Sequence, residues 1–148
     1  MTYIPNFETI AKAHGHTCPG IALGYKIAVA AAKWSGSDTN ISVVSHTTRC
    51  PLDAIKQTFD LKKHPERLIV DDTNTVSFVL EKIDGSKLFI DEVPNTKLTS
   101  KELHMLKEKI AANTATPEDI ARHNAIQREF LQIMLNTPNE KLFTIREA

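Results

Sequence analysis

The chain has 148 residues, of which 41% are hydrophobic and 24% charged, values that are ordinary for a globular protein. Eighteen lysines and arginines balance eighteen aspartates and glutamates, which argues against nucleic acid or an anionic membrane as the main partner. The longest apolar run, Ile27 to Ala32, is too short to cross a bilayer. Two cysteines and no signal-peptide pattern predict a protein of the reducing cytoplasm.

The first predicted elements are two helices separated by a short motif. Asn6 can cap a helix that runs to about Ala13. Gly20 opens a second, alanine-rich helix, which ends at Ser35-Gly36. The second helix is apolar around most of its circumference, so we expect it at the centre of the fold. The motif between them is "HGHTCPG", residues 14–20.

The segment that follows, up to Pro94, alternates between strand and helix patterns. Strand patterns rich in β-branched residues occupy 40–48, 67–72, 75–83 and 86–93. A helix is predicted at 52–61, after a proline that suits a first helical turn. Asp84-Gly85 joins the last two strands as a hairpin. The order α, α, β, α, β, β, β predicts an α+β fold, a mixed β-sheet with packed helices.

The composition changes after Pro94, and two helix starts follow. Thr99 and Thr116 are expected caps, each with an acidic residue three positions later. The expected apolar stripes are Leu103, Leu106 and Ile110 in the first helix, and Ile120, Ile126, Phe130, Ile133 and Met134 in the second. These helices predict a hairpin linked at 113–115, and 141–147 alternates like an edge strand.

These elements predict the domain organisation. We expect a core over residues 1–94 and a C-terminal helical hairpin over 95–148, which packs on the core within the same domain. The alanine-rich helix and the hairpin offer more apolar surface than one sheet face covers, which predicts a homodimer.

Three potential metal ligands fall within five residues of the motif: His14, His16 and Cys18. They alternate with the small residues Gly15 and Thr17, so an extended or turning backbone can point all three into one space. Imidazole nitrogen and thiolate sulfur suit zinc and similar ions. We therefore predict a divalent metal, zinc first, with nickel or iron as alternatives. The competing interpretation is a histidine that caps a helix or binds a backbone carbonyl.

The two cysteines share a local pattern, because each precedes a proline at a predicted helix start, Cys18-Pro19 and Cys50-Pro51. The helix dipole and the free backbone N–H groups at such a position favour thiolate. The pattern predicts that Cys50 joins the same metal site. Chance recurrence of Cys-Pro is one alternative, and a redox pair that needs no metal is another.

Asp53 lies one helical turn after Cys50. A carboxylate there can orient a histidine or hold a water, although an acidic residue in a first turn also simply matches the helix dipole. We predict Cys18 and Asp53 as the catalytic candidates if the metal keeps an open position for water or a carbonyl group of a small-molecule substrate.

The remaining histidines are not assigned to the site. His46, near a strand end, is expected to be partly buried and hydrogen-bonded, His64 to lie in a loop, and His104 and His123 to lie on helix surfaces. No GxGxxG, Walker, HExxH or GxSxG motif occurs. Two cysteines are too few for an iron–sulfur cluster held by one chain.

The run "HGHTCPGIALGYKIA" resembles the start of the FmdE-like family of formylmethanofuran dehydrogenase proteins, and "RCPLDAIKQTF" and "RLIVDDTNTVSFVL" continue the likeness over about residues 5–92. The resemblance implies an α+β core with a mixed sheet and a metal-binding cleft built from the histidine–cysteine turn and the second cysteine block. The positions that match the motif are His14, His16, Cys18, Cys50 and Asp53.

Two departures limit what the resemblance implies. Phe59-Asp60-Leu61 stands where the family often has Thr-Gly-Cys, so a third thiol is missing. The helical hairpin of about 99–136 replaces a cysteine-rich zinc module found in many relatives. No pterin site is visible, so the full oxidoreductase activity is not implied. The sequence leaves open whether the chain is an enzyme or an accessory or assembly subunit with a structural metal.

Overall fold

The computed structural model describes residues 4–94 and 100–148. In these ranges the helices are α1 (Phe7–His14), α2 (Pro19–Ser35), α3 (Cys50–Thr58), α4 (Lys101–Ala111) and α5 (Pro117–Asn136), with 3-10 turns at Pro65–Arg67 and Asn139–Lys141. The strands are β1 (Ser42–Ser45), β2 (Leu68–Val70), β3 (Ser77–Glu81), β4 (Lys87–Glu92) and β5 (Phe143–Glu147).

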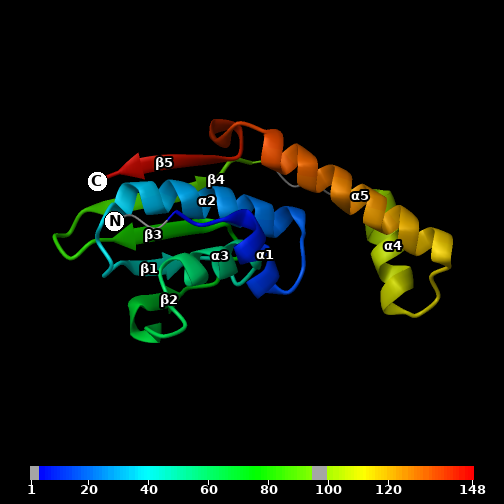
Figure 1. The fold of residues 1–148 in the computed structure, drawn as a ribbon, viewed down its shortest axis with the longest axis horizontal. Coiled ribbons are helices and arrows are strands. Elements are labelled where there is room, and N and C mark those ends of the chain that lie inside the picture. Colours follow the sequence, from blue (N-terminus) through cyan, green and yellow to red (C-terminus); the bar gives the residue numbers. More distant parts are fainter. Residues whose placement is uncertain (1–3, 95–99) are drawn as a thin grey trace.

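The strands form one mixed sheet in the order β2-β1-β3-β4-β5. Strand β1 pairs with β2 in parallel and with β3 antiparallel, and β4 pairs antiparallel with both of its neighbours. Helices α1, α2 and α3 lie together on one side of this sheet (Figure 1). The predicted α+β class is therefore confirmed, and the C-terminal strand lies at the sheet edge as expected.

The hydrophobic core lies between the sheet and α2. Alternate residues of β1, β3 and β4 are buried, in keeping with the two-residue period of a strand. Nine of the 17 residues of α2 are buried, including Ile21, Ile27 and Ala28. The prediction that this helix lies at the centre of the fold is confirmed.

A close helix crossing brings the starts of α2 and α3 together. A Cβ atom built on Gly24 would lie 2.7 Å from the Pro51 Cα and 3.0 Å from the Ala54 Cβ. Any larger residue would therefore push α3 away from α2. Since Cys50 is the first residue of α3 and Cys18 precedes α2, this contact sets how near the two cysteines come.

Helices α4 and α5 form the predicted hairpin, which extends away from the sheet (Figure 1). Leu103, Leu106 and Ile126 form a separate small apolar cluster inside the hairpin. The C-terminal part of α5 joins the main core through Met134. The Lys26 ammonium of α2 donates to the carbonyls of Met134, Leu135 and Thr137, which satisfies the free carbonyls at the end of α5.

Parts of the predicted hairpin stripes are wrong. Ile110, Ile120 and Ile133 are 38%, 44% and 43% exposed, because α4 and α5 cover each other on one side only. The observed cap of α4 is Ser100, whose side chain accepts from the Leu103 N–H. The expected cap, Thr99, lies outside the described residues.

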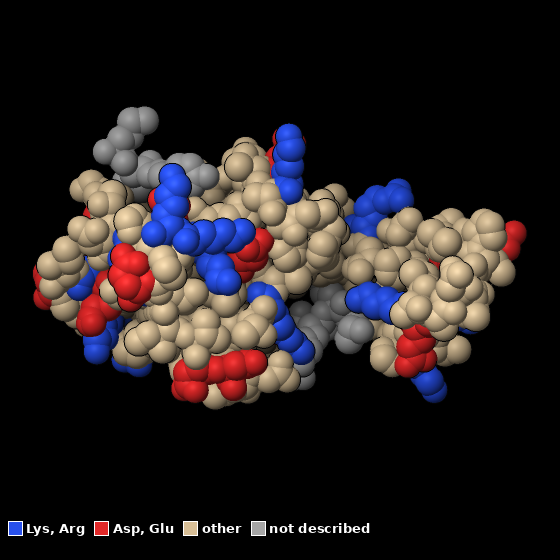
Figure 2. All heavy atoms as spheres, turned by 90° about the horizontal axis from the view of Figure 1, so that it is seen from below, with Lys and Arg blue, Asp and Glu red and all other residues tan. Residues whose placement is uncertain are grey.

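The surface carries both signs of charge, and the molecule is hollowed between its core and the hairpin, where lysine or arginine side chains border the hollow (Figure 2). No helix in ranges 4–94 and 100–148 has the length and apolarity to cross a membrane.

Candidate metal centre

Three helix ends meet at the predicted motif. Helix α1 ends at His14, and Gly15 follows with φ of 102°, in the left-handed region that favours glycine. The Gly15 N–H closes the helix on the Ala11 and Lys12 carbonyls. The chain then reaches Cys18, which is the N-cap of α2. Helix α3 begins alongside at Cys50.

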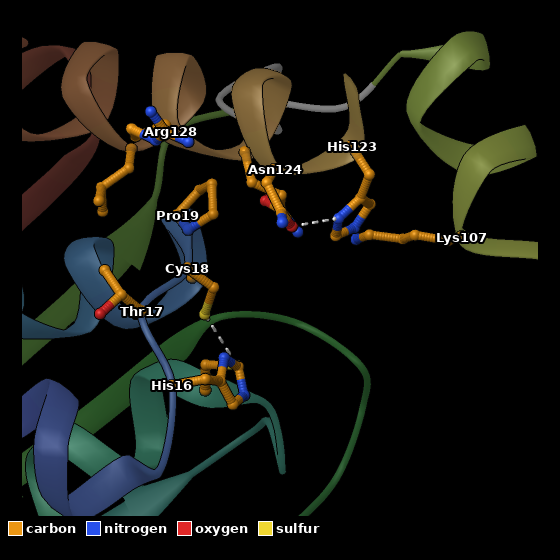
Figure 3. A pocket seen from close by; sticks show the side chains of 12 residues that line it. His16, Thr17, Cys18, Pro19, Lys107, His123, Asn124 and Arg128 are labelled. Carbon is orange, nitrogen blue, oxygen red and sulfur yellow. Dashed lines mark hydrogen bonds between the residues drawn. The ribbon is translucent and has the colours of Figure 1, made fainter. Parts of the chain in front are cut away.

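The structure brings His14, His16 and Cys18 together. One potential ligand atom from each residue lies within 4.8 Å of the other two, and the two imidazole rings are 4.5 Å apart between centroids. His14 and Cys18 are half-buried, whereas His16 is exposed. The His16 ring points toward the Cys18 sulfur (Figure 3). This cluster could bind a metal ion.

The surroundings of His14 test whether a metal fits. Its Nδ1 lies 2.9 Å from Asp53 Oδ2. A carboxylate oxygen accepts, so in the neutral form of the ring Nδ1 carries the proton and Nε2 keeps its lone pair. That Nε2 is buried and has no hydrogen-bond partner among the described residues. A buried ring nitrogen without a partner is costly, and a cation at this position would supply one. The donor set therefore fits a zinc-like ion.

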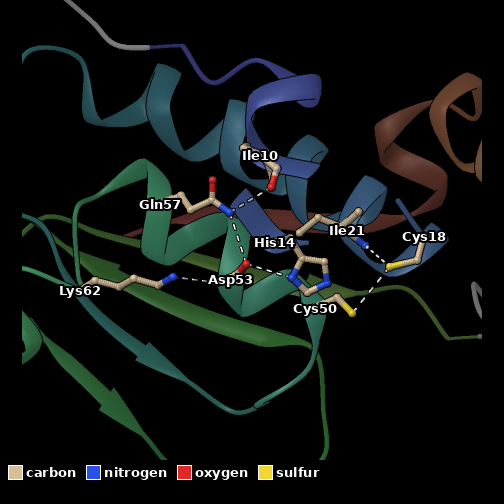
Figure 4. Close-up of polar contacts among 8 residues, drawn as sticks. All are labelled: Ile10, His14, Cys18, Ile21, Cys50, Asp53, Gln57 and Lys62. Carbon is tan, nitrogen blue, oxygen red and sulfur yellow. Dashed lines mark hydrogen bonds and ion pairs between the residues drawn. The ribbon is translucent and has the colours of Figure 1, made fainter. Parts of the chain in front are cut away.

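Asp53 is itself held in place by two further side chains (Figure 4). Gln57 Nε2 donates to Asp53 Oδ2 at 3.3 Å and also to the Ile10 carbonyl at 3.1 Å. Lys62 Nζ lies 3.8 Å from Asp53 Oδ1. These contacts fix the carboxylate that orients His14. Gln57 was not predicted as part of the site, although its position one turn after Asp53 on the same helix was a usable signal.

The two thiols lie 3.7 Å apart between sulfurs. A hydrogen bond from Cys50 lowers the pKa of Cys18 to about 5, helped by the Ile21 N–H and the neighbouring histidines and opposed by burial. The same hydrogen bond, together with burial, raises the pKa of Cys50. The negative charge therefore belongs to Cys18, because its sulfur accepts the Ile21 N–H at 3.4 Å (Figure 4).

The sulfur–sulfur distance also fits a shared metal. Two thiolates on one tetrahedral zinc, with Zn–S bonds of about 2.3 Å, lie about 3.8 Å apart. Gly20 leaves room for this pair, because a Cβ built there would lie 3.1 Å from the Cys50 Cβ and 3.8 Å from the Cys18 sulfur. The glycine of "CPG" is thus explained by space around the two thiols.

A cavity of about 650 Å³ lies between the motif and the hairpin. On the core side its lining includes His16, Cys18 and Cys50. On the hairpin side the lining residues are Lys107, His123, Asn124, Gln127, Arg128 and Leu131. We call this cavity the hairpin cleft; several of its side chains are drawn in Figure 3. A second cavity, of about 470 Å³, includes His14 and Asp53 in its lining.

The other histidines differ in their surroundings. His46 Nδ1 lies 3.0 Å from the Asp71 carbonyl, away from the cluster. His64 and His104 pair with nearby glutamates on the surface. His123, which the sequence placed on a helix surface, lines the hairpin cleft. The spacing of His123, Gln127 and Leu131 marks one face of α5, but nothing in the sequence shows that this face meets the Cys18 turn.

The block that lacks the third thiol keeps a special backbone conformation. Asp60 has φ of 56°, in the left-handed region that favours glycine, the residue at this place in the resembled Thr-Gly-Cys pattern. Phe59 and Leu61 are buried in the main core. Leu61, which stands at the position of the missing thiol, therefore packs in the core of this chain.

Comparisons with known proteins support the resemblance. A family model described as "FmdE, Molybdenum formylmethanofuran dehydrogenase operon" matches residues 13–144. The match begins later than the predicted likeness over 5–92, but it continues past residue 92 and includes both hairpin helices. A crystal structure of an FmdE-like protein of tungsten formylmethanofuran dehydrogenase from Syntrophus aciditrophicus is similar, with a TM-score of 0.58 and 14% identity over 95% of this chain and 68% of that one. At this identity the likeness shows the fold alone. No curated protein matches the chain.

Proposed function

Because the chain belongs to the FmdE family, and because its motif gathers imidazoles and thiols at one point, we propose that it binds a zinc-like divalent ion. The proposed ligands are His14 through Nε2, His16 and Cys18, with Cys50 in reach as a fourth. The single observation that carries this proposal is the buried, unpartnered His14 Nε2 within the three-residue cluster.

Cys50 distinguishes two forms of the proposal. If Cys50 completes the ligand set, the site is closed and the metal is structural, as expected for an accessory or assembly subunit. If Cys50 stays a thiol that donates to Cys18, one position is open to the hairpin cleft. We favour the open form, because the cleft borders His16, Cys18 and Cys50 directly.

An ion held here would supply Lewis-acid chemistry or an activated water. Asp53 orients the His14 ring through Nδ1. Cys18 is held as the thiolate by the Cys50 thiol and the Ile21 N–H. Asp53 and Cys18 are the two catalytic candidates predicted from the sequence, and the proposal gives each of them one of these roles.

Elemental analysis of protein purified without a metal-affinity tag tests the proposal. We expect about one zinc per chain, and loss of that metal in the double variant Cys18→Ser/His16→Ala. His104→Ala is the matched control, because His104 lies on the hairpin surface paired with Glu108. Metal content that is unchanged in the double variant would overturn the proposal.

The distance between the thiols also supports a second candidate, a Cys18/Cys50 redox pair, because sulfurs 3.7 Å apart need only a small movement to bond. This alternative leaves the two imidazoles and Asp53 without a task. Mass spectrometry after mild oxidation separates the candidates. A disulfide that forms equally fast with and without added zinc would favour the redox pair, whereas protection by zinc would favour the metal site.

We further propose a cytoplasmic homodimer. Reduced thiols are needed at the site, which suits a reducing compartment. Met105, Ile120 and Ile133 of the hairpin are 51%, 44% and 43% exposed, and a second copy could cover them. Sedimentation velocity tests this, and a monomer at all concentrations that also persists when zinc is added would contradict it.

A further inference from the structure

The hairpin cleft carries positive charge on one wall. On the hairpin side, the charged side chains in its lining are Lys107 of α4 and Arg128 of α5, and no aspartate or glutamate lines the cleft among the described residues. In the space-filling view, lysine or arginine side chains border the hollow between core and hairpin (Figure 2). Such a wall attracts anions.

Two other basic residues of the hairpin have acidic partners, whereas Lys107 and Arg128 have none among the described residues. Arg122 donates to Glu102 at 2.9 Å, and Lys109 lies 3.7 Å from Asp119. Within ranges 4–94 and 100–148, neither Lys107 nor Arg128 forms an ion pair. The cations that line the cleft are thus not neutralised by a neighbouring carboxylate.

Further polar groups and a small apolar surface complete this wall. The His123 ring Nδ1 lies 3.1 Å from Asn124 Oδ1, and the Lys107 side chain reaches toward the same ring (Figure 3). Gln127 supplies a further amide, and Pro19 and Leu131 supply apolar contact. A cavity of about 650 Å³ has the size typical of small-molecule sites.

From these observations we infer that the hairpin cleft binds a small organic anion, which Lys107 and Arg128 hold by its carboxylate or phosphate group. Guanidinium and ammonium groups bind both kinds of anion. The inference rests on the proposed function for one point only: the far end of the bound molecule lies beside His16 and Cys18, where the metal would act. It names the class of substrate for that site.

Calorimetric titration of the full chain, with and without zinc, tests the inference with three probes: succinate, inorganic phosphate and the neutral succinamide. We expect one of the anions to bind and succinamide not to bind. Lys107→Gln/Arg128→Gln should weaken anion binding about tenfold. The preferred anion then identifies the recognised group.

Lys109→Gln/Arg122→Gln is the matched control, because it removes the same charge from two paired residues of the same hairpin. It should change anion affinity less than twofold. Equal weakening in both double variants, or no binding of either anion by the zinc-free and the zinc-bound chain, would overturn the inference.

Elemental analysis of the same samples separates this inference from the proposed function. Charge-dependent anion binding by a chain that holds no zinc would contradict the metal site and support the anion site. Zinc binding with no charge-dependent anion binding would support the metal site and contradict the anion site.

Discussion

His14 has its two ring nitrogens in different surroundings. Asp53 occupies Nδ1 at 2.9 Å, while Nε2 is buried without a partner in the described chain. A histidine placed only for stability would have both nitrogens satisfied or one exposed to water. This asymmetry is the residue-scale reason for regarding His14 as a ligand.

We expect Asp53→Asn to lower zinc affinity by about 10- to 100-fold, because an amide cannot hold the His14 N–H as a carboxylate does. Competition with a coloured chelator measures the change. Glu66→Gln is the control, since Glu66 makes a similar contact to His64 on the surface, at 3.3 Å. An equal loss in both variants would show that general charge, and not orientation of His14, is responsible.

The thiols should differ in reactivity in the metal-free protein. The hydrogen bond from Cys50 lowers the pKa of Cys18 to about 5, so Cys18 stays a thiolate as the pH falls from 8 to about 6 and loses its charge only below that range. We expect its alkylation by iodoacetamide to be nearly constant there, while Cys50, whose pKa is raised, reacts slowly. Peptide mass spectrometry reports both rates.

Two variants of Cys50 provide the control for this prediction. Cys50→Ser keeps a donor to Cys18, whereas Cys50→Ala removes it. The alkylation curve of Cys18 should move to higher pH mainly in Cys50→Ala. Identical curves in both variants would mean that the Cys50 hydrogen bond does not stabilise the thiolate.

At the scale of elements, the two glycines at the start of α2 have separate tasks. Gly24 faces the backbone of Pro51, whereas Gly20 faces the side chain of Cys50. We expect Gly24→Ala to lower the free energy of unfolding by about 2 kcal/mol, through overpacking at the α2–α3 crossing. Gly20→Ala should instead weaken zinc binding with little change in the unfolding of the metal-free protein. Denaturant titration and chelator competition on both variants check this difference. Equal changes in unfolding free energy and in zinc affinity for the two variants would contradict it.

The contact between Lys26 and the end of α5 joins the hairpin to the core. Its ammonium donates to the Met134 and Leu135 carbonyls at 3.2 and 3.4 Å. We expect Lys26→Met to lower the free energy of unfolding by about 1–2 kcal/mol and to speed proteolysis within α5. Lys33→Met, an exposed change in the same helix, should do neither.

The element order and the mixed sheet could be predicted from the sequence because periodicity and turn residues are local signals. Boundaries were less accurate: β2 covers Leu68–Val70 where six residues were expected, although the Asp71 N–H still donates to the Ser45 carbonyl of β1 at 2.8 Å. The motif could be recognised because its three potential ligands fall within five residues of the sequence. Lys107 and Arg128 could not be assigned to the site from the sequence, because their nearness to Cys18 depends on how the hairpin packs.

At the scale of the whole molecule, the hydrophobic core does not depend on the metal cluster. Cys18 and Cys50 only pack against the edge of that core. We therefore expect chelator-treated protein to keep its far-ultraviolet circular dichroism spectrum but to melt at a lower temperature. Added zinc should raise the melting temperature again, because it binds the folded state. Unfolding on metal removal would instead indicate a structural metal.

The division of the chain at residue 94 stays a prediction.

The residues of the proposed metal site all lie between positions 14 and 53, whereas the opposite wall of the cleft belongs to residues 107–131. The two proposals therefore assign metal chemistry and ligand selection to separate parts of one short chain. Substitutions on the inner face of α5 can change which molecule is admitted while the coordinating turn stays intact.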